Sequence, residues 1–270
     1  MSENTQMIRA AFEKAGPKLA EVMPSGLTPE RFTRIAIGEI MGNPNLAKAS
    51  PATLLKAVMD AARLGLSVGG AQGEAYLVPY KGAVQCQIGY RGLLKLARRS
   101  GEIAGIAAEI VREGDPFRYD AAEQRIWHTP DVFDAEREAR PIIGAYAIAT
   151  LKSGERQTAV MSRAEIERIR QGSQGRNAAP WSDHWAEMAK KTALRRLCKM
   201  LPMEVEAAVA IDRDDRAEYP QYARPPGVVD ARQTAADVGS RMLTFDVDEA
   251  AGDDCEDVER AAIQAESEGA

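Results

Sequence analysis

The stretch PYKGAVQCQIGYRGLLKLARRSG, residues 79–101, contains the change of hydrophobic period that decides the fold. In its first half Val84, Cys86 and Ile88 alternate with glutamines, which is the period of a strand with one apolar and one polar face. Lys81-Gly82 separates this run from the preceding EAYLVPY, so the two runs predict a tight β-hairpin. In the second half the leucines recur at helical spacing, which predicts a helix directly after the hairpin.

This stretch is also strongly basic and contains no Asp or Glu. On a helical wheel of about 100° per residue, the bases of the predicted helix share one arc and its leucines fall on the opposite side. The pattern predicts a helix that buries its leucines and exposes a cationic stripe near a helix N-terminus, where anions are also favoured. The basic residues of the hairpin and helix are Lys81, Arg91, Lys95, Arg98 and Arg99.

A second basic segment, MAKKTALRRLCKMLP at 188–202, shows a similar pattern. We expect a long helix that Ser182 caps and that ends near Met200, before a proline. Lys191, Arg195 and Lys199 are spaced by four and predict one cationic stripe, with Arg196 beside it. Lys190 falls among the apolar positions, so its side chain is expected to extend along a groove.

Charge is distributed unevenly along the 270 residues. The net charge is −5, but the segment from Glu218 to the end holds 13 acids and 4 bases, which leaves 31 bases and 27 acids for the rest. The acid-rich segment contains few aromatic residues and is predicted to be a disordered tail. The remaining part is mildly basic, which suggests a polyanionic partner for it.

The rest of the chain predicts an α+β fold, in which a small antiparallel sheet with a hairpin is packed by several helices. Ser-Pro and Thr-Pro pairs predict helices that begin after Thr28 and Ser50, and Gly16-Pro17 is expected to break an N-terminal helix over 2–22. A capping box at Ser162 predicts a short helix. The expected strands beyond the hairpin are 103–113, 116–119, 125–128, 141–151 and 155–161.

Three regions follow from these patterns: an N-terminal helical segment at 1–27 that could contact other subunits, a mildly basic core at 28–216 that could bind the polyanion, and the acidic tail at 217–270, which could dock partners. No apolar run approaches the ~20 residues that cross a bilayer. Three scattered cysteines suit a reducing compartment, so a cytoplasmic protein without a membrane partner is expected.

Signals for catalysis are weak. The chain has no Gly-Lys dipeptide and therefore no Walker A lysine, and it has no Gly-x-Ser-x-Gly elbow. The three cysteines and two histidines do not form a zinc-ligand pattern. The run DRDD at 212–215 could bind a divalent cation or could be the polar end of a helix. No cofactor is expected to be required, and Mg²⁺ is expected at most to modulate activity.

Single-strand binders combine basic side chains with exposed aromatic rings, where stacking contributes ~1–3 kcal/mol per base. Tyr90 and Trp181 are candidates for stacking, although Trp181 and Trp185 could also be core residues. Each cationic stripe could likewise be a solvated helix face. The candidate DNA-binding residues are Lys81, Gln85, Gln87, Tyr90, Arg91, Lys95, Arg98, Arg99, Arg176, Trp181, Lys190, Lys191, Arg195 and Arg196.

Two contiguous blocks, GEAYLVPYKGAVQCQIGYRGLLKLARRSG at 73–101 and WAEMAKKTALRRLCKMLP at 185–202, resemble the signature blocks of the RecT family of phage and prophage single-strand annealing proteins. At lower density the resemblance extends over about 28–215. It implies a bacterial, phage- or prophage-encoded recombinase that anneals complementary DNA strands without ATP, as an oligomeric ring or helical filament. It also implies a basic groove that neighbouring subunits extend.

The partners that this resemblance implies are single-stranded DNA, the annealed duplex, further copies of the chain and a RecE-type exonuclease. A host single-strand-binding protein is a further candidate partner. The competing hypotheses are a passive protein that coats single-stranded DNA and a Mg²⁺-dependent DNA nuclease. The sequence leaves open the subunit number, the preference for one strand or the duplex, the exonuclease, and the role of the tail.

Overall fold

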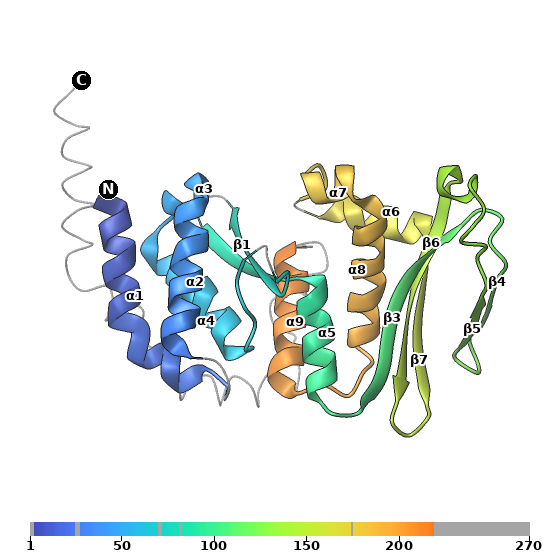
Figure 1. Cartoon of the computed structure of the whole chain (residues 1–270), viewed down its shortest axis with the longest axis horizontal. Helices are drawn as coiled ribbons and strands as arrows, with labels where there is room; N and C mark the ends of the chain where they lie inside the picture. The colour runs from blue at the N-terminus through green and yellow to red at the C-terminus, as the bar shows by residue number, and fades with distance from the viewer. Residues whose placement is uncertain (1–2, 25–27, 70–71, 81–82, 174, 219–270) are drawn as a thin grey trace, which may run out of the picture. The chain divides into compact units, whose positions relative to one another are not determined.

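The computed structural model describes residues 3–24, 28–69, 72–80, 83–173 and 175–218 (Figure 1). The described residues divide into two compact units at Gln87. We describe each unit by itself. The acidic tail, predicted to be disordered, lies outside the described residues apart from residues 217–218, which are the end of a helix that begins before the tail.

The first unit is a small helical bundle with a two-stranded sheet. Its helix α1 packs on both α2 and α4, and the short α3 and α4 contact strand β1. The two strands pair with each other and are joined by two residues, a connection that only antiparallel strands allow. The predicted hairpin is therefore confirmed. The elements are α1 (Glu3–Val22), α2 (Pro29–Gly42), α3 (Pro44–Ala47), α4 (Pro51–Arg63), β1 (Ala75–Tyr80) and β2 (Ala83–Ile88).

The predicted break of the first helix at Gly16-Pro17 is wrong, because α1 runs through Pro17 without interruption. A proline inside a helix removes one hydrogen bond and costs about 3 kcal/mol or more. Ile8, Phe12 and Leu19 lie on one stripe of α1, before and after the proline, and all three are fully buried. Burial of this stripe against α2 and α4 offsets the lost hydrogen bond.

The second unit is built on a three-stranded antiparallel sheet in the order β3-β6-β7. In the central strand Ala145, Ala147 and Ala149 are buried on one face. Their register partners on the outer strands include Ala108 and Ala159, so this face is lined by small side chains and lets a helix approach closely. The strands are β3 (Ile103–Arg112), β6 (Ile142–Leu151) and β7 (Arg156–Ser162).

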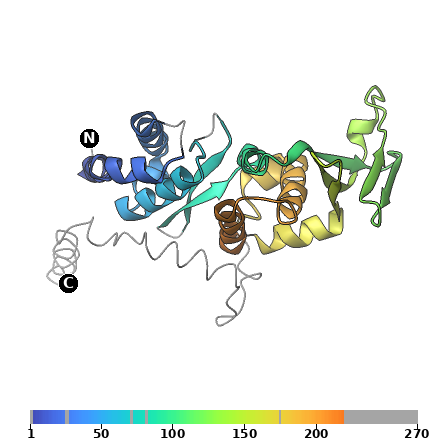
Figure 2. The same ribbon diagram turned by 90° about the horizontal axis from the view of Figure 1, so that it is seen from below.

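Helices cover one side of this sheet and a separate hairpin covers the other (Figures 1 and 2). Helix α8 packs along all three strands through Ala189, Ala193 and Leu197, and α6 contacts the two later strands. The hairpin β4–β5 contacts β7 from the opposite side. The remaining elements are β4 (Phe117–Asp120), β5 (Arg125–His128), a 3₁₀ turn (Arg137–Ala139), α5 (Tyr90–Arg99), α6 (Arg163–Gly172), α7 (Ala179–Asp183), α8 (Trp185–Cys198) and α9 (Val205–Glu218).

Two predicted helix starts have different outcomes. The capping box is confirmed, because the Ser162 side chain accepts a hydrogen bond from the Glu165 amide while the Glu165 carboxylate accepts one from the Ser162 amide. Ser182 does not cap the long helix. It lies inside the short α7, where its hydroxyl donates a hydrogen bond to the Asp183 carboxylate. The residue that precedes α8 is His184.

The α+β class and the predicted strands are confirmed, although the strands form three small sheets instead of one. No helix among the described residues is long and apolar enough to cross a membrane. The division into regions 1–27, 28–216 and 217–270 remains a prediction.

Candidate nucleic-acid interface

Helix α5 presents the cationic stripe that the sequence predicts. Leu93, Leu96 and Ala97 are at most 1% exposed, and the helix packs with this face on α8 and β3. Arg91, Lys95 and Arg98 lie on the other face and are exposed. The sequence folds this way because its leucines occupy only one side of the helix, so burial of that side directs the bases into solvent.

The arginines of α5 differ in whether a carboxylate neutralises their charge. Within the described part of the chain, neither Arg91 nor Arg98 forms an ion pair. Arg99 is different: its guanidinium lies 2.5 Å from the carboxylate of Glu204, and its side chain is 28% exposed. Arg91 and Arg98 are therefore better placed than Arg99 to bind an external anion.

Tyr90, at the start of α5, lies in an electrostatic cluster with Lys190 of α8. Burial raises the pKa of Tyr90, and the nearby charge of Lys190 opposes this rise. Burial alone would lower the pKa of Lys190, but the hydrogen bond from its ammonium to Glu187, 2.6 Å away, and the nearby charges of Glu187 and Glu109 together outweigh burial and raise it. Lys190 is thus a charged, half-buried group whose charge acts on Tyr90 at the start of α5, a neighbour that the sequence did not predict.

Arg195 does not lie on an exposed stripe, so that prediction is wrong. Its side chain is 6% exposed and its guanidinium lies 2.6 Å from Asp214 and 3.2 Å from Asp215, both in α9. Asp214 also accepts a hydrogen bond from the backbone amide of Ile88. Through Asp214, the ion pair connects α8, α9 and Ile88, the first residue of the second unit. Because Arg195 is buried and already paired with two carboxylates, it is unsuited to contact DNA.

The other bases of α8 have separate neighbours. Arg196 is exposed and lies 3.2 Å from Glu165, at the start of α6. Lys199 forms an ion pair with Asp215, and Lys191 is half-buried. The cations of α8 therefore face α5, α6 and α9 separately and do not form the single stripe that the spacing of four predicted.

The aromatic candidates are mostly enclosed. Trp181 is 2% exposed and is therefore a core residue, so its ring cannot stack on a DNA base. Trp185 is half-buried: its indole N–H donates to Glu167 at 2.6 Å, and the guanidinium of Arg163 lies 4.8 Å from its ring centroid. Tyr90 remains the partly exposed ring beside the α5 stripe.

The remaining candidate DNA-binding residues lie in different parts of the chain. Lys81 lies outside the described residues. Gln85 and Gln87 are half-buried on β2, in the first unit. Arg176 is exposed in the loop before α7, and its carbonyl accepts a hydrogen bond from Arg170. In the second unit the structure thus brings together the α5 bases, Tyr90 and Lys190, while Arg195 and Trp181 belong to the core.

The acids of the run DRDD have basic partners. Asp212 pairs with Arg216 at 2.5 Å, and Asp214 and Asp215 pair with Arg195. Among the described residues, no group of three or more acidic, histidine or cysteine side chains is placed to hold a metal ion.

One basic and aromatic group was not found from the sequence. Arg118, Arg125 and Trp127 share the outer face of the β4–β5 hairpin. The strands themselves were predicted, and an antiparallel pairing of 116–119 with 125–128 would have placed these side chains on one face. The missing step was the register of the pair, which depends on the tight turn between the strands.

Comparison with known proteins gives a consistent result. A model described as the RecT family matches residues 30–226. The chain is 42% identical to protein RecT of Escherichia coli strain K12 over 208 residues, which are 74% of this chain and 76% of that protein. It is 28% identical to the uncharacterized protein YqaK of Bacillus subtilis strain 168 over 196 residues, 72% of this chain and 67% of that protein.

Proposed function

The chain belongs to the RecT family, and on that premise we propose that it binds single-stranded DNA and anneals complementary strands in recombination without ATP. The observation that supports this most is the face of α5, where Arg91, Lys95 and Arg98 are exposed on the side opposite the buried Leu93 and Leu96. A rigid helix holds these cations at fixed spacing, which suits the repeated phosphates of a nucleic-acid backbone.

In the proposed mechanism, the protein binds phosphates and leaves the bases free. Arg91 and Arg98 hold one length of backbone, while Tyr90 and Lys190 border it at the start of the helix. Because the base edges are not contacted, sequence specificity comes from Watson–Crick pairing between the two strands.

Strand pairing needs no hydrolysis in this mechanism. Two single strands repel each other through their phosphates, and arginine side chains that neutralise phosphates lower this repulsion. The duplex is more stable than the separated strands, so the reaction proceeds without a coupled energy source. Mg²⁺ can modulate the rate by screening the same charges.

We further propose that the protein acts as an oligomer, a ring or helical filament in which neighbouring subunits extend the DNA-binding surface. A RecE-type exonuclease would supply the single strand, and a host single-strand-binding protein would be the competing ligand of that strand. These partners follow from the family resemblance.

The proposal is tested by replacing Arg91 and Arg98 together by glutamine. Neither residue supports the fold, so circular dichroism and thermal unfolding should be unchanged. Loss of two phosphate contacts should lower oligonucleotide affinity roughly tenfold at low salt and reduce the slope of log K against log salt by about 1.4. The annealing rate of complementary oligonucleotides without nucleotide should fall in parallel.

The matched control replaces Arg31 and Arg34, two exposed arginines of α2, by glutamine and so removes the same charge. Equal losses in both variants would assign the effect to net charge and refute a role for α5. Wild-type pairing no faster than spontaneous pairing would favour the passive coating protein. Shortened strands on incubation with Mg²⁺ would favour the nuclease.

A further inference from the structure

The outer face of the β4–β5 hairpin carries two arginines stacked on an exposed tryptophan. Register places Arg118 directly opposite Trp127, and Arg125 lies two residues before Trp127 on the same face. The two guanidinium carbons are 4.9 and 4.8 Å from the indole ring centroid. Trp127 is 36% exposed, which is high for a tryptophan.

The inner face of the same hairpin is fastened to the main sheet near its turn. Gln124, held in the left-handed region at φ 51°, accepts hydrogen bonds at 3.0 and 2.8 Å from the amide and hydroxyl of Thr158 in β7. The Tyr119 hydroxyl lies 3.2 Å from the Thr158 hydroxyl oxygen and can donate to it, since the single Thr158 proton is directed to Gln124. A non-glycine residue with positive φ is uncommon, and here the side-chain bonds stabilise it.

The open end of the hairpin is fastened as well. The His128 ring lies 3.2 Å from both the Tyr146 hydroxyl and the Asp115 carboxylate, and Phe117 packs on Tyr146. Arg137 donates two hydrogen bonds to Asp115, at 2.7 and 2.8 Å. Anchors at both ends fix the orientation of the outer face, so its arginines are held in place before any ligand binds.

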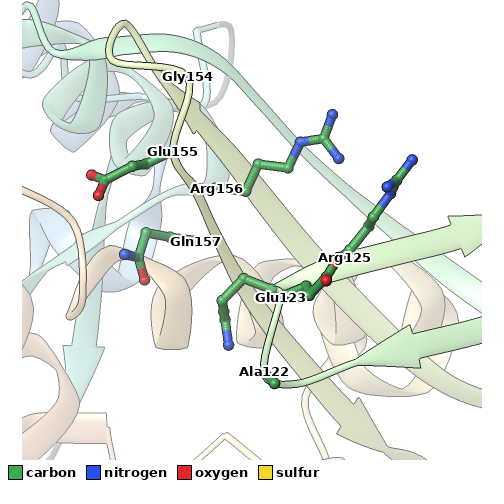
Figure 3. A pocket seen from close by; sticks show the side chains of 8 residues that line it. Ala122, Glu123, Arg125, Gly154, Glu155, Arg156 and Gln157 are labelled. Carbon is green, nitrogen blue, oxygen red and sulfur yellow. The ribbon is translucent and has the colours of Figure 1, made fainter.

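A third arginine extends this surface from the main sheet. Arg125 and Arg156 line the same solvent-open hollow of about 570 Å³, and in Figure 3 their side chains extend in the same direction while Glu155 points away. Glu123 and Glu155 also line the hollow. Within the described residues, neither glutamate forms an ion pair with Arg118, Arg125 or Arg156.

These features favour an extended polyanion over a small ligand. The hollow is open, and the arginines lie along an exposed surface instead of converging on one enclosed point. A guanidinium stacked on an indole keeps its N–H groups free to donate to phosphate oxygens in a bidentate way. An accessible aromatic ring beside such donors is typical of surfaces that bind single strands.

We propose that Arg118, Arg125, Arg156 and Trp127 form a second binding surface for the sugar–phosphate backbone of single-stranded DNA. It lies on the opposite side of the β3-β6-β7 sheet from α8, on which α5 packs (Figures 1 and 2). A second length of strand can therefore bind here while α5 holds the first. This inference rests on the proposed function and adds to it a separate site.

The test uses the full chain with Arg118, Arg125 and Arg156 all replaced by glutamine. The control replaces Arg31, Arg34 and Arg168, three exposed helix arginines, by glutamine. Anisotropy of a labelled oligo-dT is measured over a range of NaCl concentrations. The hairpin variant should bind at least tenfold more weakly than the control, with a salt slope smaller by about 2, from a slope of about 0.7 per phosphate.

A second readout reports direct contact. Addition of oligo-dT should quench part of the tryptophan emission of the wild type, and this part should be missing in Trp127→Phe. Quenching of equal size in both proteins, or a hairpin variant that binds like its control, would overturn the inference.

These outcomes can be separated from failure of the proposed function. If the wild type binds and anneals oligonucleotides and only the hairpin variant equals its control, the second surface is refuted and the annealing function stands. If the wild type binds no oligonucleotide, both are refuted.

Discussion

Arg195 and Arg196 are adjacent in the chain and similar in sequence context, but they have opposite environments. Arg195 is 6% exposed and paired with two aspartates, whereas the side chain of Arg196 is 43% exposed and paired with one glutamate. A buried arginine that loses its acidic partners is left as an uncompensated charge. Buried aspartates that lose their arginine are left uncompensated in the same way, at a similar cost in stability. An exposed pair contributes little because water screens it.

We therefore predict that Arg195→Ala destabilises the protein strongly. Its removal leaves Asp214 and Asp215 buried beside a cavity, which should lower the free energy of unfolding by about 3–5 kcal/mol. Urea denaturation followed by circular dichroism measures this change.

Arg196→Ala is the matched control and should change the free energy of unfolding by less than about 1 kcal/mol. A double alanine variant of both residues would lose annealing through loss of the fold, so it cannot report on DNA contact. Equal stability of the two single variants would contradict the structural role of Arg195.

At the scale of elements, the β4–β5 hairpin depends on one buried carboxylate. Hydrogen bonds from Arg137, against the opposing effect of burial, lower the pKa of Asp115 well below its usual value. A carboxyl group whose pKa is lower in the folded state stabilises the fold above its unfolded pKa, which is about 4. This stabilisation is lost as the pH falls through the folded value.

Asp115→Asn should accordingly lower the free energy of unfolding at pH 7 by on the order of 2–3 kcal/mol. The difference from the wild type should shrink below about pH 4, because Asp115 becomes protonated in the unfolded wild type while it is still ionised in the folded protein. Unfolding curves between pH 2 and 7 check this expectation.

Glu123→Gln serves as control, because Glu123 is an exposed acid on the same hairpin. Its stability should follow the wild type at every pH. A stability difference for Asp115→Asn that stays constant down to pH 2 would show that the carboxylate is not the group that titrates.

Most elements were predictable because their signals are local. The strand at 142–151 and the capping box at Ser162 follow from period and side-chain chemistry over a few residues. The errors concern long-range packing. Helix α1 continues through Pro17 because its apolar stripe is buried, and Ser182 lies within the short α7 instead of capping α8. The short α3 was not predicted, since four residues carry little periodic signal.

The candidate site shows the same limit. The exposed face of α5 was predictable because its leucines all lie on one side. The acids that neutralise Arg195 are 19 and 20 residues later in the chain, in α9, and helical spacing within α8 cannot reveal them. Likewise, the arginines around Trp127 come together through strand register and not through sequence proximity.

For the whole molecule, the uneven charge is the main physical feature. The acid-rich segment from Glu218 onward lowers the net charge of a chain whose other part is mildly basic. Such a segment can compete with DNA for basic side chains or can keep the protein soluble, and acidic tails often have only the second effect.

We expect that deletion of residues 219–270 leaves oligonucleotide affinity at low salt unchanged within about twofold and lowers solubility. Anisotropy titrations and light scattering of the full and shortened chains measure the two quantities. A large gain in affinity on deletion would instead establish autoinhibition.

The contact of Asp214 with both Arg195 and the amide of Ile88 sets a limit on how the chain can be dissected. An expression fragment that stops after α8 would contain both family-like blocks but would lack the counter-charge for a buried guanidinium. Such a fragment would also lose the acceptor that holds the backbone entering α5. Fragments made for crystallisation or display should therefore extend at least through Arg216, even when only α5 is of interest.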